Sequence, residues 1–184
     1  MPAQSSYDQV AALIRARAVL QALDDTGGVY LVPAHCGLGA PHWQPEARGL
    51  ISGLTLGARR THIVRAALEA MAHQTHDLKT AFAADGAEWE RLKIDGGMAA
   101  NEWMAQDLAD MLALEVERPR FVETTALGAA MLAGVGAGLF GSLEEAAAMR
   151  GPVDRFRPHI EAAEREERLG RWSRAVEAAL GSRS

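Results

Sequence analysis

The chain has 184 residues and a formal net charge of −5, and 48% of its residues are hydrophobic. This composition suits one sizeable domain with a packed core and offers no basic surface for nucleic acid. The single cysteine, Cys36, excludes an internal disulfide. No apolar run is as long as a membrane span, and the N-terminus lacks the apolar core of a signal peptide. We therefore expect a cytoplasmic protein with no nucleic-acid or membrane partner.

The first half of the chain alternates between helical and strand periodicity. The predicted elements are a helix at 7–23, a strand at 29–32, a Gly- and Pro-rich loop at 34–45, a strand at 50–54 and a long helix at 61–83. Thr61 is expected to be the N-cap of the long helix. His73 and His76 lie on one side of that helix, where we expect a solvated face or a domain contact; a metal or acid–base role is the weaker alternative.

A strand, a Gly-Gly turn and a helix are predicted at 92–114. Apolar and polar residues alternate from 92 to 94 as in a short buried strand, Gly96 and Gly97 break the strand, and a helical period begins at Ala99. Glycine backbone at the start of a helix can approach a ligand closely, and a nucleotide is the obvious candidate. From the glycines alone, a tight turn without a ligand is the better-supported interpretation, because a lone Gly-rich turn is a weak motif.

The second half continues the alternation. The predicted elements are a strand that ends at Pro119, a helix at 126–138, a short helix at 143–149, a linker from Gly151 and a last helix at 161–180. Thr124 or Thr125 is expected to cap the helix at 126–138, whose many small residues predict close packing against a neighbour. The last helix carries an apolar stripe and a ladder of Glu–Arg pairs; we expect the ladder on a solvated face, with docking of a regulator as the alternative. The whole pattern predicts an α/β fold with a partly parallel sheet.

Three groups of residues stand in a distinctive order and spacing. They are Gly37-Leu38-Gly39-Ala40-Pro41 with Trp43 and Ala47-Arg48-Gly49; Gly49 to Leu54 with His62 to Glu69; and Asp95-Gly96-Gly97-Met98-Ala99-Ala100-Asn101 with Glu123-Thr124-Thr125-Ala126-Leu127-Gly128-Ala129-Ala130. Together they resemble the C-terminal domain of the FGGY carbohydrate kinases, most closely the members that phosphorylate glycerol. The resemblance covers about residues 28 to 178.

The resemblance implies two ribonuclease-H-like (actin-like) domains with ATP in the cleft between them, the C-terminal one holding the adenosine. It implies that Gly97 and Asn101 contact the nucleotide and that Gly96 gives the backbone room. Asn101, one turn into the expected helix, would offer a donor and an acceptor to a base edge. The family's N-terminal half, and the start of its C-terminal half with the catalytic aspartate, have no counterpart here. The fold is therefore expected to lack its opening strands, and no catalytic residue is assigned.

Other residues with reactive side chains are given structural roles. His35, Cys36 and His42 lack the paired spacing of a zinc site, and no base is placed for Cys36 as a nucleophile, so no metal ligand is assigned. Asp95 is expected to anchor its loop rather than to act as a base.

These observations predict a connection at 1–27, a partial nucleotide-binding domain at 28–150, and a linker with a helix at 151–184. The resemblance implies part of an enzyme that uses ATP and Mg²⁺ to phosphorylate glycerol or a related polyol, and a chain that is inactive alone because the base and the phosphate loop are missing. The alternative is a non-catalytic nucleotide-binding or interaction module derived from the kinase fold. Missing strands would leave an uncovered sheet edge, so we also expect a homo-oligomer.

Overall fold

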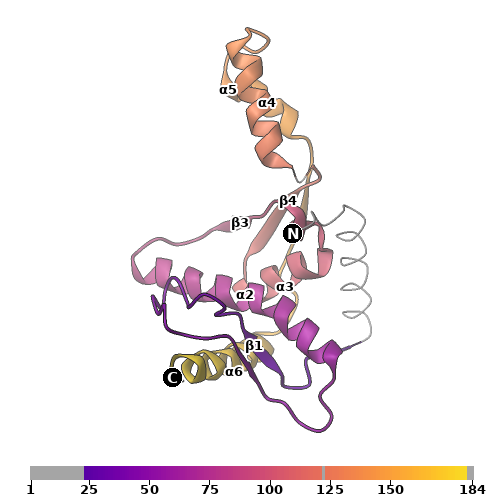
Figure 1. The fold of residues 1–184 in the computed structure, drawn as a ribbon. Helices are drawn as coiled ribbons and strands as arrows, with labels where there is room; N and C mark the ends of the chain where they lie inside the picture. Colours follow the sequence, from indigo (N-terminus) through magenta and orange to yellow (C-terminus); the bar gives the residue numbers. More distant parts are fainter. Residues whose placement is uncertain (1–22, 122, 182–184) are drawn as a thin grey trace, which may run out of the picture.

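The computed structural model describes residues 23–121 and 123–181 (Figure 1). The helix expected at 7–23 lies outside the described residues, save for its last one. The elements are β1 (Tyr30–Val32), β2 (Leu50–Ser52), α2 (Arg60–Ala84), β3 (Arg91–Lys93), the 3₁₀ turn η1 (Gly97–Ala100), α3 (Glu102–Leu112), β4 (Glu115–Pro119), α4 (Thr124–Gly136), α5 (Leu143–Ala146), the 3₁₀ turn η2 (Ala147–Arg150), β5 (Val153–Phe156) and α6 (Ala162–Gly181). Within these ranges no helix is both long and apolar enough to cross a bilayer.

The strands form two small sheets. β1 and β2 pair antiparallel, with Tyr30 opposite Ser52, and β4 lies between β3, which runs parallel to it, and β5, which runs antiparallel. The predicted α/β pattern with a partly parallel sheet is confirmed. The interpretation of the segment after Gly151 as a linker is wrong, because β5 pairs with β4 through Phe156 opposite Val116.

Two apolar cores hold the described elements together. The first joins β1, α2 and α6 around Trp172 and Val176, which belong to the apolar stripe predicted for the last helix and are 2% and 4% exposed. The second joins α2, α3 and β4, with Met111 and Val116 fully buried. β3 contributes only the half-buried Leu92, so the expected buried strand is a strand at the edge of the described sheet. The long helix α2 passes between the two cores and touches both (Figure 1).

The starts of three helices differ from the sequence expectations. α2 begins after Arg59 rather than Thr61, because the His62 Nδ1 atom accepts a hydrogen bond from the Arg59 N–H at 3.0 Å. α3 begins only at Glu102, after a separate 3₁₀ turn. α4 begins at Thr124, whose hydroxyl donates to the Asp95 carboxylate instead of capping its own helix.

Helices α4 and α5 stand apart from the rest of the fold (Figure 1). The close packing expected of the small residues of α4 is present at the buried Gly134, where an added Cβ would lie 2.7 Å from the Phe140 ring, but not at Gly128, where nothing lies within 4 Å of an added Cβ. Leu132 and Leu139 are 62% and 75% exposed. This pair of helices therefore presents an apolar surface that the described residues do not cover.

A group of charged side chains is enclosed between α2, α3 and α6. Arg168 donates from Nη2 to Asp107 Oδ1 at 2.6 Å and lies 3.4 Å from Glu69 Oε2, while Arg65 pairs with Glu69 at 2.8 Å. Glu69 and Asp107 are each 5% exposed. The expected solvated ladder is therefore wrong for Arg168, although Arg171 and Glu167 do pair along the helix as predicted.

His73 also lies inside the fold rather than on a solvated face. It is 1% exposed and stacks on the Trp172 ring with a centroid distance of 5.2 Å and an interplanar angle of 11°. Burial, with the nearby Arg168 charge, lowers the pKa of His73 to about 3, so this ring is neutral at physiological pH.

Candidate functional site

The turn between β3 and α3 has an open face. Gly96 has φ = +81°, a backbone conformation that residues with a Cβ rarely adopt, and Gly97 follows as the first residue of η1. A Cβ built on either glycine meets no atom within 4 Å. The described fold therefore leaves room for a ligand against the backbone of both residues.

Asn101 lies at the end of this turn and caps α3. Its Oδ1 atom accepts a hydrogen bond from the Met104 N–H at 3.3 Å, and its backbone N–H donates to the Met98 carbonyl at 3.1 Å. The expectation that Asn101 lies one turn into a helix is therefore wrong. Capping takes up one lone pair of Oδ1, and no hydrogen bond of Nδ2 is present among the described residues. Asn101 can thus offer an N–H donor to a base while it holds the helix start in place.

A buried arginine on β4 forms a hydrogen bond with the backbone of the turn. Arg118 on β4 donates from Nη1 to the Ala99 carbonyl at 3.0 Å and from Nη2 to Asp154 Oδ2 at 2.9 Å. The hydrogen bonds from Arg118 and Arg120 hold the pKa of Asp154 below its usual value. The turn is therefore attached to the sheet through the Ala99 carbonyl, and the ion pair with Asp154 holds the Arg118 guanidinium in place.

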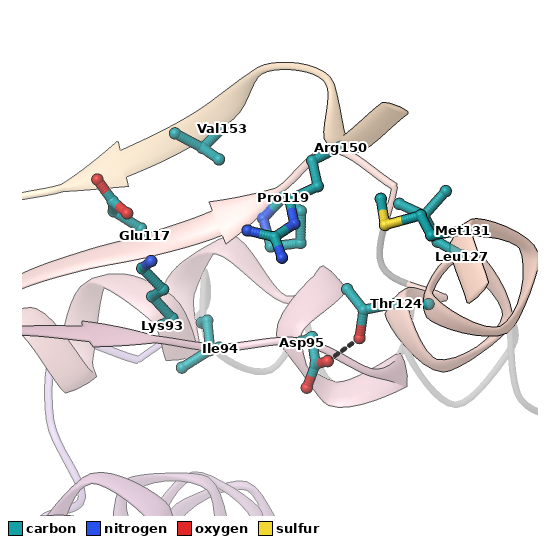
Figure 2. A pocket seen from close by; sticks show the side chains of 11 residues that line it. Lys93, Ile94, Asp95, Glu117, Pro119, Thr124, Leu127, Met131, Arg150 and Val153 are labelled. Atoms are coloured by element: carbon teal, nitrogen blue, oxygen red, sulfur yellow. Dashed lines mark hydrogen bonds between the residues drawn. The ribbon is translucent and has the colours of Figure 1, made fainter. Parts of the chain in front are cut away.

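A cavity of about 470 Å³ opens beside the turn, where β3 and β4 end (Figure 2). Its lining combines apolar residues with a few charged groups: Lys93, Ile94, Asp95, Glu117, Pro119, Thr124, Leu127, Gly128, Met131, Arg150 and Val153. The Thr124 hydroxyl donates to the Asp95 carboxylate, as Figure 2 shows, and so ties the start of α4 to the end of β3. This contact confirms the anchoring role expected of Asp95.

Charged groups of both signs surround the turn and the adjoining cavity. Glu102 lies in the first turn of α3 and Asp95 precedes Gly96, so two carboxylates flank the glycines. Glu102 Oε1 lies 4.0 Å from Arg118 Nη2, and a planar base or a ribose can lie against the glycine backbone and the apolar side chains. Glu117, on the cavity wall, has its pKa lowered because Arg155 donates to it, so it too carries a negative charge.

The open turn leaves room for a ligand, and its surroundings offer no cluster of metal-binding side chains among the described residues. Among the described residues no group of three or more His, Cys, Asp or Glu side chains could hold a metal ion. Cys36 is exposed, and His42 faces Asp77 across 3.5 Å.

The structure brings Gly96, Gly97 and Asn101 into one turn, as the sequence predicted, but none of the three lines the adjoining cavity. Sequence reasoning missed the cavity walls and Arg118. A local signal existed for Asp95, because it directly precedes Gly96 in the sequence and also lines the cavity. None existed for Arg118, because its contact with Ala99 spans 19 residues along the chain.

Comparison with known proteins places this chain in a family. Residues 3–137 match the model of the FGGY family of carbohydrate kinases, C-terminal domain. The glycerol kinases of Coxiella burnetii (strain Dugway 5J108-111) and Gluconobacter oxydans (strain 621H) are each 52% identical to this chain, over 158 and 159 residues and 86% of its length. These matches cover 32% and 31% of the two relatives, so the chain spans about a third of their length.

Solved structures agree with this assignment. The crystal structure of Plasmodium falciparum glycerol kinase with ADP has a TM-score of 0.79 and 32% identity, and covers 95% of this chain and 36% of its own. A gluconate kinase from Lactobacillus acidophilus has a TM-score of 0.73 at 21% identity, covers 91% of this chain and 35% of its own, and supports the fold alone. The expected ribonuclease-H-like fold of a C-terminal domain fragment is thereby confirmed. The chain belongs to the FGGY family of carbohydrate kinases, whose C-terminal domain it represents in part.

Proposed function

We propose that this chain is the C-terminal part of a glycerol kinase, an enzyme that transfers the γ-phosphoryl group of Mg-ATP to glycerol, and that it holds the adenosine of the nucleotide. The 52% identity to curated glycerol kinases supports the choice of enzyme. The observation that carries the assignment of the site is the open backbone face at Gly96 and Gly97, with the Asn101 amide at its end. We place the protein in the cytoplasm, where the exposed Cys36 stays reduced.

Each residue of the turn has a defined role in this proposal. The nucleotide base or ribose lies on the backbone of Gly97, Gly96 supplies the conformation that opens the turn, and Asn101 donates from Nδ2 to an acceptor of the base. We assign phosphate binding, Mg²⁺ coordination and proton removal from glycerol to other parts of the enzyme, because this chain spans about a third of the length of the curated glycerol kinases. We therefore propose that the chain alone has no turnover.

Replacement of Gly97 with valine is expected to weaken binding of ADP at least about tenfold, because the branched side chain occupies the space that the ligand needs. Isothermal titration of ADP into the wild-type chain and the variant measures this effect. Gly39→Val is the matched control, because Gly39 is exposed, has an open Cβ position as well, and lies in the loop after β1. Equal ADP affinity of wild type and Gly97→Val would refute the site, and absence of ADP binding by the wild type would refute the proposed role.

We also propose that the chain forms a homo-oligomer through its uncovered apolar surface. The free edge of β3 carries Arg91 and Lys93, and charged residues oppose strand addition at an edge. The exposed Leu132 and Leu139 on the α4–α5 side are therefore the more favourable contact.

Light scattering over a concentration series is expected to show dimers of the wild type, and the double variant Leu132→Glu, Leu139→Glu is expected to remain monomeric. A wild type that is monomeric at every concentration would show this proposal to be wrong. The exposed Leu56, 110% exposed in the loop between β2 and α2, provides the control variant Leu56→Glu, which should still dimerise.

A further inference from the structure

Arg118 is a charged residue in an unusually enclosed position. Its side chain is 10% exposed and its guanidinium lies over the Phe156 ring, 5.1 Å from the centroid. A buried charge is tolerated only when its hydrogen-bonding capacity is used. Arg118 meets this condition with the Asp154 carboxylate on β5 at 2.9 Å and the Ala99 carbonyl in η1 at 3.0 Å.

The contact with Ala99 fixes the middle of the turn that carries Gly97 and Asn101. Ala99 is 1% exposed, and its N–H donates to the Gly96 carbonyl at 3.1 Å. The Ala99 methyl group and carbonyl are thus both held by the body of the fold, while the two glycines beside it have open Cβ positions. A turn held at its centre can keep glycine backbone in one conformation without any contact on its ligand side.

Arg120, which directly follows β4, provides a natural comparison. It donates from Nε to the other oxygen of Asp154 at 3.1 Å, yet its side chain is 68% exposed, and its contacts within the described residues do not include the turn. The two arginines share the Asp154 carboxylate, but only Arg118 reaches Ala99, and its Nη2 also lies 4.0 Å from Glu102 Oε1 at the start of α3. An effect specific to Arg118 cannot arise from the charge balance at Asp154 alone.

We propose that Arg118 is a positioning residue for nucleotide binding: it holds the Gly96–Asn101 turn in its binding conformation through the Ala99 carbonyl, and Asp154 fixes the orientation of its guanidinium. This inference rests on the proposed adenosine site and adds a residue that does not itself touch the nucleotide. A guanidinium presents its N–H groups in a fixed planar arrangement that reaches the carbonyl and the carboxylate together. A lysine at this position has a single ammonium group and cannot reproduce that arrangement.

The test combines amide hydrogen exchange with ADP titration on the whole chain, for wild type, Arg118→Lys, Asp154→Asn and Arg120→Lys. In Arg118→Lys the amides of Ala99 and Asn101 should exchange about tenfold faster and ADP affinity should fall about tenfold, because the link to the turn is lost. Asp154→Asn keeps Arg118 and should give a smaller change in the same direction. Arg120→Lys should leave both measurements within about twofold of wild type.

A general loss of stability must be separated from this effect. Val116→Ala, at a fully buried position on the same strand, should lower the thermal midpoint without weakening ADP binding. If wild type binds ADP and Arg118→Lys binds it equally well, or if Arg118→Lys and Arg120→Lys give the same exchange at the turn, the positioning role is refuted while the adenosine site stands. If the wild type itself binds no ADP, the proposed function fails and this inference fails with it.

Discussion

Replacement of Trp172 with alanine is expected to lower the free energy of unfolding by about 3–5 kcal/mol, the largest stability effect that we predict for a single substitution. Trp172 is 2% exposed and lies in the core that joins β1, α2 and α6. Its ring stacks on the buried His73, and its Nε1–H donates to Asp77 Oδ2 at 2.8 Å. The substitution removes all of these contacts and leaves a cavity between elements from both ends of the described chain.

Denaturant titration of Trp172→Ala, Trp172→Phe and Trp89→Ala measures the effect. Trp172→Phe keeps an aromatic ring against His73 and loses the hydrogen bond to Asp77, so a loss of about 1–2 kcal/mol is expected. Trp89 is half-buried and pairs with Phe82 at a centroid distance of 5.6 Å, and its removal should cost about 1 kcal/mol. A loss for Trp172→Ala no larger than that for Trp89→Ala would contradict the central place of this residue in the core.

The second large effect is a pH dependence that the substitution Asp107→Asn should reveal. Burial is the main cause that raises the pKa of Asp107 from its ordinary 3.8 to about 7, and the nearby Arg168 opposes that rise only in part. The folded protein then holds a proton that the unfolded chain releases between about pH 4 and pH 7. The contribution of this group to the free energy of unfolding is fully present below pH 3.8 and is lost as the pH rises through about 7. The free energy of unfolding falls by up to about 1.4 kcal/mol per pH unit over this interval.

His73 has the opposite sign over nearly the same pH range. Its pKa falls from 6.5 to about 3 on burial, so the unfolded chain binds a proton that the folded protein does not, and stability rises with pH over this interval. The two slopes oppose each other in the wild type. The Asp107→Asn substitution leaves an amide oxygen that can accept the hydrogen bond from Arg168. It removes the pH dependence due to Asp107 and keeps that due to His73.

The expected result is that Asp107→Asn gains stability relative to wild type as the pH is raised from 4 to 7, with no further change at higher pH. His73→Phe, which can still stack on Trp172, should show the reverse: relative to wild type, its stability should decline over the same interval. Urea titrations at half-unit pH steps measure both differences. A difference between Asp107→Asn and wild type that does not vary with pH would show that folding does not change the pKa of Asp107, contrary to this prediction.

The sequence by itself determined most of the helices and strands and the family to which the chain belongs. Hydrophobic periodicity and the Gly and Pro breaks predicted the strands at 29–32 and 50–54, the strand that ends at Pro119, and the helices α2 and α6, because these signals depend on neighbours within a few residues. The Asp95–Asn101 segment and the motif at 123–130 predicted the nucleotide-binding family, which the matched family model confirms. That Gly96, Gly97 and Asn101 bind nucleotide stays a prediction.

Only the tertiary structure decided where the charged and capping residues act. The contact between Arg168 and Asp107 spans 61 residues and that between Trp172 and Asp77 spans 95, so no local pattern could distinguish a buried partner from a solvated one. The same holds for β5, whose sequence predicts a linker and which forms a strand because it pairs with β4. It also holds for Arg118, whose hydrogen bond to the Ala99 carbonyl joins two distant segments. Local periodicity reports how a segment divides polar from apolar faces, whereas the burial of a charge depends on a partner from a distant segment.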